Sequence, residues 1–413
     1  MIKVLHTSDW HLGRELYNHD RTAEFNAWFE WLIETIRNEH IDVLVVAGDI
    51  FDVVNVPTSA QELYYRFLTQ ASGLCQIFVT SGNHDSGRFI DAPAELMKCL
   101  KIIAVGRPRD IKDEVFVVRD ENQSAQLIVC AVPFLRQDDL YNLLSDEERA
   151  DKECVTKRGL QKHYADVAAY VASLRQELGQ DLPAIAMGHL MTSGAVKGGD
   201  DGVLNLYVGT LEGVTDDIFP NDFDYVALGH IHRPQRVNHR DDIRYCGSPI
   251  AMGFDERCDD KVVCMITFDG RKKHIETKPI PVFQRLTRVE SDNVKEIIEA
   301  LKALVTKDES VWVEVNYTGT ELIRGLDAIV ENVIHDSKVR CIHLKNPSYV
   351  QKLLKDDGIE TTELRELDPE YIFESLLKQE KIEGEVADIL RVTYKEALHA
   401  VQTDDKNSYS HLN

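Results

Sequence analysis

The chain has 413 residues, more than one ordinary hydrophobic core accommodates, so its length predicts two or three domains. With 43% hydrophobic and 28% charged residues it has the composition of a globular protein, and no run of 18 apolar residues predicts a membrane span. The formal net charge of −23 argues against nucleic-acid binding through a generally basic surface. It still allows clustered carboxylates that hold cations, a local basic patch, or a separate basic partner.

The N-terminal half alternates short apolar runs with helical patterns, which predicts an α/β core. Helices are expected at 24–40, where apolar residues recur at helical spacing, and at 60–72 after a Pro-Thr-Ser cap. A polar stretch from about 136 to 165 is interpreted as an excursion from that core. Strands are expected at 2–6, 41–47, 75–81, 127–132, 184–188, 224–229, 242–247 and 262–268.

The C-terminal part contains two stretches that we interpret as linkers. Residues 279–284, PIPVFQ, contain two prolines that favour extended backbone, and 347–367 are polar and weakly patterned. Between them, 285–346 show a β-α-β-α-β pattern. Residues 368–402 predict two amphipathic helices and 403–413 a disordered tail. The predicted domains are therefore 1–278, 285–346 and 368–402.

Eight scattered cysteines form no C-x-x-C pair, and the N-terminus resembles no signal peptide. Together these features predict reduced thiols and a cytoplasmic location.

Five of the expected strands end on polar residues that bind metals well. In an open α/β sheet such groups converge outside the carboxyl ends of the strands. A glycine precedes four of the five sets, where the backbone turns off the strand. The residues are Asp9 and His11, then Asp49 with Asp52, then Asn83, His84 and Asp85, then His189, and finally His230 and His232.

The types of donor atom narrow the choice of metal ion. No thiolate is among them, which disfavours structural zinc, while carboxylate, imidazole and carboxamide groups together suit Mn²⁺, with Mg²⁺, Fe²⁺, Co²⁺ or Zn²⁺ as alternatives. Seven donors exceed what one tetrahedral ion needs, and they fit two octahedral ions about 4 Å apart that share a carboxylate. Such a pair activates water for attack on phosphorus.

The sequences DWH, GDIFD, GNHD, GH and GHIH, in that order, resemble the five motifs of the calcineurin-like metallophosphoesterases over residues 1–275. The added βαβαβ module and terminal helices resemble the DNA-repair nuclease branch of this family. The resemblance implies an α/β fold: a two-sheet metallophosphoesterase core flanked by helices, a small capping domain that helps to hold DNA, and a C-terminal helix pair.

Carried over motif by motif, the resemblance implies one ion bound by Asp9, His11, Asp49 and His232. It implies a second ion bound by Asp49, Asn83, His189 and His230, with Asp49 as the bridge. His84 would face the scissile phosphate and stabilise or protonate the leaving oxygen. Asp52 would hold the ring of His84, whereas Asp85 is expected to be a structural acid that fixes the GNHD turn.

The resemblance also implies a substrate and partners. It predicts a metal-dependent DNA nuclease, acting as a double-strand exonuclease and a hairpin or single-strand endonuclease in DNA repair, recombination and replication. An SMC-like ATPase of the SbcC type would bind 368–402, and a homodimer would form through 60–72 and 92–101. The chain would be cytoplasmic and associated with the nucleoid in use.

Two other functions compete with the nuclease. The acidity favours a phosphodiesterase or phosphoprotein phosphatase acting on a small or protein substrate, and a non-catalytic scaffold is the third alternative. In support of the nuclease, basic residues near the rim in sequence could contact DNA phosphates, namely Arg14, Arg88, Lys101, Arg107, Arg109, Arg233 and Arg236.

Overall fold

The computed structural model describes residues 1–149, 155–193, 214–321 and 323–346, together with nine single residues between 373 and 394. The predicted linker 347–367, the tail 403–413 and most of the helix pair 368–402 lie outside the described residues. The chain forms two compact units, Met1–Thr287 and Arg288–Asn413.

The first unit contains two six-stranded sheets. In the first sheet the strand order is β12-β11-β1-β2-β3-β4, with β1 to β4 parallel and β11 and β12 antiparallel at one side. The strands are β1 (Ile2–Thr7), β2 (Val43–Ala47), β3 (Gln76–Thr80), β4 (Ile102–Val105), β11 (Val262–Asp269) and β12 (Lys272–Pro279).

The second sheet has the order β5-β6-β7-β8-β10-β9. Its four inner strands are parallel, whereas β5 and β9 at the edges run antiparallel to their neighbours. The strands are β5 (Val115–Arg119), β6 (Ala125–Cys130), β7 (Ala184–His189), β8 (Tyr225–Gly229), β9 (Gln235–Arg236) and β10 (Ile243–Tyr245).

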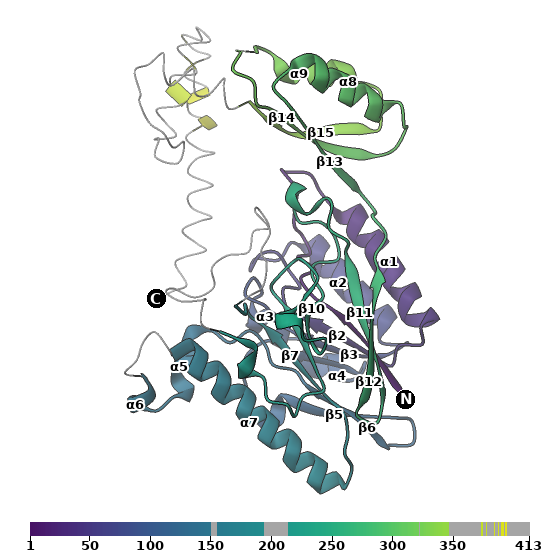
Figure 1. The fold of residues 1–413 in the computed structure, drawn as a ribbon, viewed down its shortest axis with the longest axis vertical. Helices are drawn as coiled ribbons and strands as arrows, with labels where there is room; N and C mark the ends of the chain where they lie inside the picture. The colour runs from purple at the N-terminus through teal and green to yellow at the C-terminus, as the bar shows by residue number, and fades with distance from the viewer. Residues whose placement is uncertain are drawn as a thin grey trace. The chain divides into compact units, whose positions relative to one another are not determined.

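The two sheets pack face to face, and helices cover their outer faces (Figure 1). Val45 and Phe78 of the first sheet share one apolar core with Val129 and Met187 of the second. Helices α1 (Thr22–Asn38) and α2 (Thr58–Ala71) pack on the first sheet, and α7 (Val155–Leu178) packs on the second. The predicted two-sheet α/β core is therefore confirmed.

Shorter helices complete the first unit. They are α3 (Gly87–Asp91), α4 (Ala94–Lys98), α5 (Gln137–Leu143) and α6 (Asp146–Arg149), with 3-10 turns at Ile111–Asp113, Asp216–Ile218, Val237–His239 and Phe254–Glu256.

The interpretation of 136–165 as an excursion is wrong for its second half. Residues from Val155 onward belong to α7, which buries Leu160, Tyr164, Val167 and Val171 against the second sheet. Their spacing of four, three and four residues is helical, but charged side chains on the outer face of the helix concealed it in the sequence.

The second unit contains a three-stranded sheet in the order β13-β14-β15, with β14 and β15 parallel. Helices α8 and α9 bury Ile297, Leu301 and Val330 in one core with Val313 and Val315 of β14. The elements are β13 (Arg285–Ser291), α8 (Val294–Val305), β14 (Val311–Tyr317), α9 (Leu326–Ile334) and β15 (Val339–Lys345), which is the predicted β-α-β-α-β order.

The stretch 279–284 belongs to the first unit, where Ile280 is buried and Phe283 packs against the core. Across the described parts of the chain, no helix combines the length and apolar character needed to span a bilayer.

Candidate metal centre

The carboxyl ends of strands from both sheets bring the predicted donors together. Six of the seven side chains are buried, and Asn83 is partly exposed. The buried donors form two groups, Asp9 with His11 and His232, and Asp49 with His189 and His230. Within each group the ligand atoms lie within 4.8 Å of one another, which is close enough to hold one cation.

Asp49 lies between the two groups. Its Oδ2 atom is 3.2 Å from Nε2 of His189 in one group and 3.6 Å from Nε2 of His11 in the other. One carboxylate oxygen thus faces an imidazole of each group, which is the arrangement that a ligand shared by two cations requires.

Asn83 joins the second group through its carboxamide. The Oδ1 atom lies 3.0 Å from Nε2 of His189 and 3.2 Å from Nδ1 of His230. It therefore presents a neutral oxygen donor at the point where these two rings meet.

Two features of the imidazoles fit a bound cation. The Nε2 atoms of His11 and His232 are 3.0 Å apart and buried, so their lone pairs would repel one another unless a proton or a cation lay between them. The buried Nε2 of His230 has no hydrogen-bond partner. Buried nitrogen lone pairs without a hydrogen-bond donor are available to bind a metal ion. The residues present therefore fit divalent cations.

Without a bound metal, protonation of His189 would offset the negative charge of Asp49. Burial alone would lower the pKa of His189, but the Asp49 carboxylate, together with Asp9, raises it to about 9. Burial would likewise raise the pKa of Asp49, yet His189, His84 and His11 hold it well below its usual value. Burial lowers the pKa of both His11 and His230.

The backbone around the donors is strained. Asp9, His11, Asp49 and His230 have φ angles of 52°, 47°, 49° and 98°, in the left-handed region that non-glycine residues rarely adopt. Residues in such conformations cluster at functional sites, where the surrounding structure holds them in place.

The glycines before the donors permit close packing as well as turns. A Cβ atom on Gly229 would lie 1.9 Å from the carbonyl oxygen of Ala47, and one on Gly48 would lie 2.3 Å from Nδ1 of His189. The same carbonyl of Ala47 accepts a hydrogen bond from Nδ1 of His189 at 3.0 Å. The two sheets can therefore bring their donors together only if these positions lack side chains.

His84 and Asp52 lie at the edge of the cluster, and their contact differs from the predicted one. Nδ1 of His84 donates to the main-chain carbonyl of Asp52 at 2.9 Å. The carboxylate of Asp52 lies instead 3.2 Å from Nδ1 of His11 and 3.3 Å from the guanidinium of Arg14. Burial would raise the pKa of Asp52, but His11 and Arg14 hold it below its usual value.

Asp85 acts as the structural acid that the sequence predicted. Its carboxylate accepts the backbone N–H groups of Ile50, Phe51 and Gly82 at 3.1, 2.9 and 2.8 Å. Burial and the neighbouring Asp49 raise its pKa to about 6. Asp85 therefore ties the GDIFD turn to the GNHD turn.

Sequence reasoning missed two charged residues that contact His232, Glu256 and Lys261. Both are buried, and Oε1 of Glu256 lies 3.3 Å from Nδ1 of His232. Burial would raise the pKa of Glu256, but Lys261 and His232 hold it well below its usual value. Neither residue follows an expected strand at the rim, so the strand-end pattern could not find them.

The basic residues proposed for DNA contact are largely committed to carboxylates. Arg107 and Arg109 pair with Asp91, and Arg14 pairs with Asp52. Arg233 and Arg236 likewise pair with Asp259 and Asp241. The rim therefore owes little free positive charge to these five arginines.

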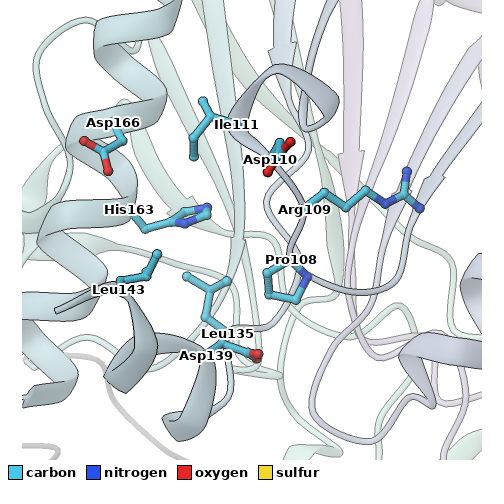
Figure 2. A pocket seen from close by; sticks show the side chains of 9 residues that line it. All are labelled: Pro108, Arg109, Asp110, Ile111, Leu135, Asp139, Leu143, His163 and Asp166. Carbon is cyan, nitrogen blue, oxygen red and sulfur yellow. The ribbon is translucent and has the colours of Figure 1, made fainter.

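A cavity of about 250 Å³ is separate from these donors (Figure 2). It lies beside α7, and His163 and Asp166 of that helix line it together with Arg109. None of its lining residues is a predicted metal ligand or catalytic residue. His163 is instead paired with the buried carboxylate of Glu114 at 2.9 Å, which indicates a structural role.

Comparison with known proteins agrees with the geometry. The calcineurin-like phosphoesterase family matches residues 2–234, and the SbcD_C family, described as the type 5 capsule protein repressor C-terminal domain, matches residues 282–381. The SbcD subunit of nuclease SbcCD from Escherichia coli K12 is 31% identical over 406 residues, which cover 97% of this chain and 98% of that protein. Proteins of the same name from Rhodobacter capsulatus and Bacillus subtilis are each 32% identical, and the matches cover 80% and 62% of this chain and 84% and 63% of those proteins.

Proposed function

The chain belongs to the calcineurin-like phosphoesterase family, and we propose that it is the nuclease subunit of an SbcCD-type complex, a phosphodiester hydrolase that cleaves DNA. The observation that carries the proposal is the position of Asp49, whose one oxygen faces an imidazole of each donor group. The likeness to nuclease subunits over nearly the whole chain disfavours the phosphatase alternative.

The chain's own residues would hold two divalent cations and orient the phosphodiester. Asp9, His11, Asp49 and His232 would bind one cation, and Asp49, Asn83, His189 and His230 the other. Bound cations supply charge stabilisation for the phosphoryl transition state and acidify water. The mixed oxygen and nitrogen donors favour Mn²⁺, with the other divalent ions as alternatives.

His84 is suited to assist the leaving group. The hydrogen bond from its Nδ1 to the Asp52 carbonyl leaves Nε2 of the half-buried ring available to a substrate. The backbone N–H of His84 donates to Oδ1 of Asp49 at 2.9 Å, so the main chain at His84 is tied to the proposed bridging carboxylate. We infer that His84 stabilises or protonates the leaving oxygen, while Asp52 fixes His84 through its carbonyl and His11 through its carboxylate.

The proposed substrates are duplex DNA ends and hairpins. The test is digestion of end-labelled linear duplex and of a hairpin by the purified chain with Mn²⁺, alone and with its ATPase partner. Metal-dependent digestion that EDTA abolishes is the expected result. Cleavage of only small phosphodiesters under both conditions would support the alternative, and inertness with metal bound would support a scaffold.

The negative net charge of the chain has a consequence for its DNA affinity. Since the chain carries a net charge of −23 and five of its rim arginines are paired with carboxylates, DNA affinity of the chain alone should be weak and steeply salt-dependent. The partner and the second unit, as the proposed capping domain, would supply the missing contacts.

The helix pair 368–402 is the proposed docking segment for an SbcC-type, SMC-like ATPase. Among its few described residues, the rings of Phe373 and Tyr394 stack with their centroids 4.0 Å apart and Glu374 pairs with Arg391, so the two predicted helices contact each other. Helices that present an apolar face often dock into a partner's groove. Loss of ATPase binding on removal of residues after 367 is the expected result of a pull-down.

A homodimer would form through the segment 92–101. Leu63, Tyr64, Phe67 and Leu68 of the predicted contact helix lie in the core. Exposed apolar residues in or near the two predicted contact segments include Leu96, Leu100 and Leu74, which are 73%, 43% and 37% exposed. Exposed apolar patches often mark interfaces.

We also propose a cytoplasmic, nucleoid-associated location, supported by seven described cysteines that are all free thiols.

A further inference from the structure

A buried ion pair stands directly behind His232. Lys261 and Glu256 are 8% and 2% exposed, and Nζ of Lys261 donates to Oε2 of Glu256. The same ammonium group donates to Oγ of Ser248 at 2.9 Å and to the main-chain carbonyl of His232 at 3.0 Å. Its three N–H groups thus have three acceptors, so the buried charge is fully satisfied.

Glu256 extends this network to the imidazole. Its Oε1 lies 3.3 Å from Nδ1 of His232, and its Oε2 also accepts the backbone N–H of Met252 at 3.0 Å. Because an ionised carboxylate can only accept, Nδ1 of His232 carries a proton. The lone pair of Nε2 is then left facing Nε2 of His11, which is 3.0 Å away.

The other imidazoles of the two groups have weaker partners. Nδ1 of His189 meets a main-chain carbonyl, Nδ1 of His230 meets the Asn83 carboxamide, and Nδ1 of His11 meets the carboxylate of Asp52, whose side chain is 21% exposed. Within these groups His232 alone has a fully buried anion behind its ring. A buried ion pair adds little stability over an apolar pair of similar size, so stability is a poor explanation for its presence here.

We propose that Glu256 and Lys261 are positioning residues of the metal centre. Glu256 fixes the tautomer and rotation of the His232 ring, and Lys261 holds both the carboxylate and the main chain of His232. Carboxylates behind metal-bound histidines typically contribute 10- to 100-fold in metal affinity. The inference rests on the proposed function and extends it to residues outside the strand ends.

Glu256→Gln tests the role of the charge with little change in shape. If the amide nitrogen faces His232, the ring must carry its proton on Nε2, which blocks the atom that would bind the cation. Titration of the full chain with Mn²⁺ in a calorimeter should then show one site weakened by about 10- to 100-fold and the other unchanged.

A double variant separates positioning from folding. Glu256→Gln alone leaves the ammonium of Lys261 buried and unpaired, which costs stability. Glu256→Gln with Lys261→Met removes both charges, so the thermal unfolding temperature should recover while the weakened Mn²⁺ site stays weak. Glu24→Gln is the matched control, because Glu24 is a buried carboxylate of the same unit, is paired with Arg21 and lies outside both donor groups. It should lower stability and leave both Mn²⁺ affinities unchanged.

Native affinity at both sites in the double variant would overturn the inference, since the pair would then serve only the fold. Equal weakening of both sites would also overturn it, because His232 belongs to one group. If the native chain bound fewer than two Mn²⁺ ions, the metal centre itself would be refuted, and this outcome needs no variant to recognise.

Discussion

Binding of Mn²⁺ should expel a proton from His189, and the structure fixes the pH range in which this happens. In the metal-free cluster both ring nitrogens of His189 have acceptors: the Ala47 carbonyl lies 3.0 Å from Nδ1, and the Asp49 carboxylate lies 3.2 Å from Nε2. A doubly protonated ring satisfies both contacts. A cation bound at Nε2 would require this proton to leave.

The expected magnitude follows from the pKa of His189, which Asp49 raises from 6.5 to about 9 against the effect of burial. At pH 7.5 the ring is almost fully protonated, so loading the site should release about one proton. His11 and His230, whose pKa values are lowered by burial, add none at this pH. Apparent Mn²⁺ affinity should therefore rise about tenfold per pH unit below pH 9 and level off above it.

The same shift makes the metal-free protein less stable at high pH. Because the folded-state pKa of His189 lies above its unfolded value of 6.5, its contribution is complete below pH 6.5 and is lost as the pH rises through about 9. For a shift of this size the contribution is of the order of 3 kcal/mol. Denaturant unfolding of the metal-free chain at pH 6.5 and pH 9.5 measures it.

Calorimetric titration in buffers of different ionisation enthalpy counts the released protons. Release of about one proton at pH 7.5 that disappears by pH 10 is the expected result. In His189→Asn, the donor group around Asp9 should still bind one cation, now without this release. No release from the native chain at pH 7.5, or undiminished release at pH 10, would refute the assignment of the proton to His189.

Three further predictions concern the leaving-group residue, the turn clamp and the dimer. His84→Gln should retain both Mn²⁺ ions and lose about 10²- to 10⁴-fold in turnover on linear duplex, whereas the control His274→Gln, at an exposed histidine, should have unchanged turnover. Loss of metal in His84→Gln would mean that His84 is a ligand. Asp85→Ala leaves three buried N–H groups without acceptors at about 1–3 kcal/mol each, so denaturant unfolding should show that the free energy of unfolding falls by several kcal/mol. A fall of under about 1 kcal/mol would contradict the role of Asp85 in joining the two turns. Leu96→Glu with Leu100→Glu should yield a monomer in light scattering without loss of thermal stability, and an unchanged dimer would place the interface elsewhere.

The sequence predicted helices and strands correctly where a segment showed a clear pattern of apolar residues. The parallel strand β2 is a continuous apolar run because both faces of its sheet are buried, and α1 shows its apolar face clearly. Where apolar residues are diluted by charge, as in α7, the pattern failed. Two apolar strands were also missed, β4 (Ile102–Val105) and the edge strand β5 (Val115–Arg119), because runs of only four apolar residues give little pattern to distinguish a strand from a turn of helix.

The donors of the site could be predicted because each follows a strand, and the carboxyl ends of parallel strands meet at one rim. The residues that contact these donors could not be predicted from the sequence. Whether the Asp52 carboxylate faces His84 or His11 depends on how the two turns approach each other, and no spacing in one segment encodes this. Glu256 and Lys261 reach His232 from a loop after β10, so only the folded chain shows that they belong to the site.

The strain in the donor segments and the glycines behind them have one physical origin. Donors from two separate sheets must converge on a volume of a few ångströms, and regular strand ends would leave them too far apart. The left-handed φ of Asp9, Asp49 and His230 turns each chain inward, and the absence of a side chain at Gly229 lets the sheets approach. Buried Asp49 then faces several imidazoles with only a proton on His189 to balance it, a state that a divalent cation would relieve. The fold therefore concentrates backbone strain and buried charge at one place, and a bound cation would replace the His189 proton as the partner of Asp49.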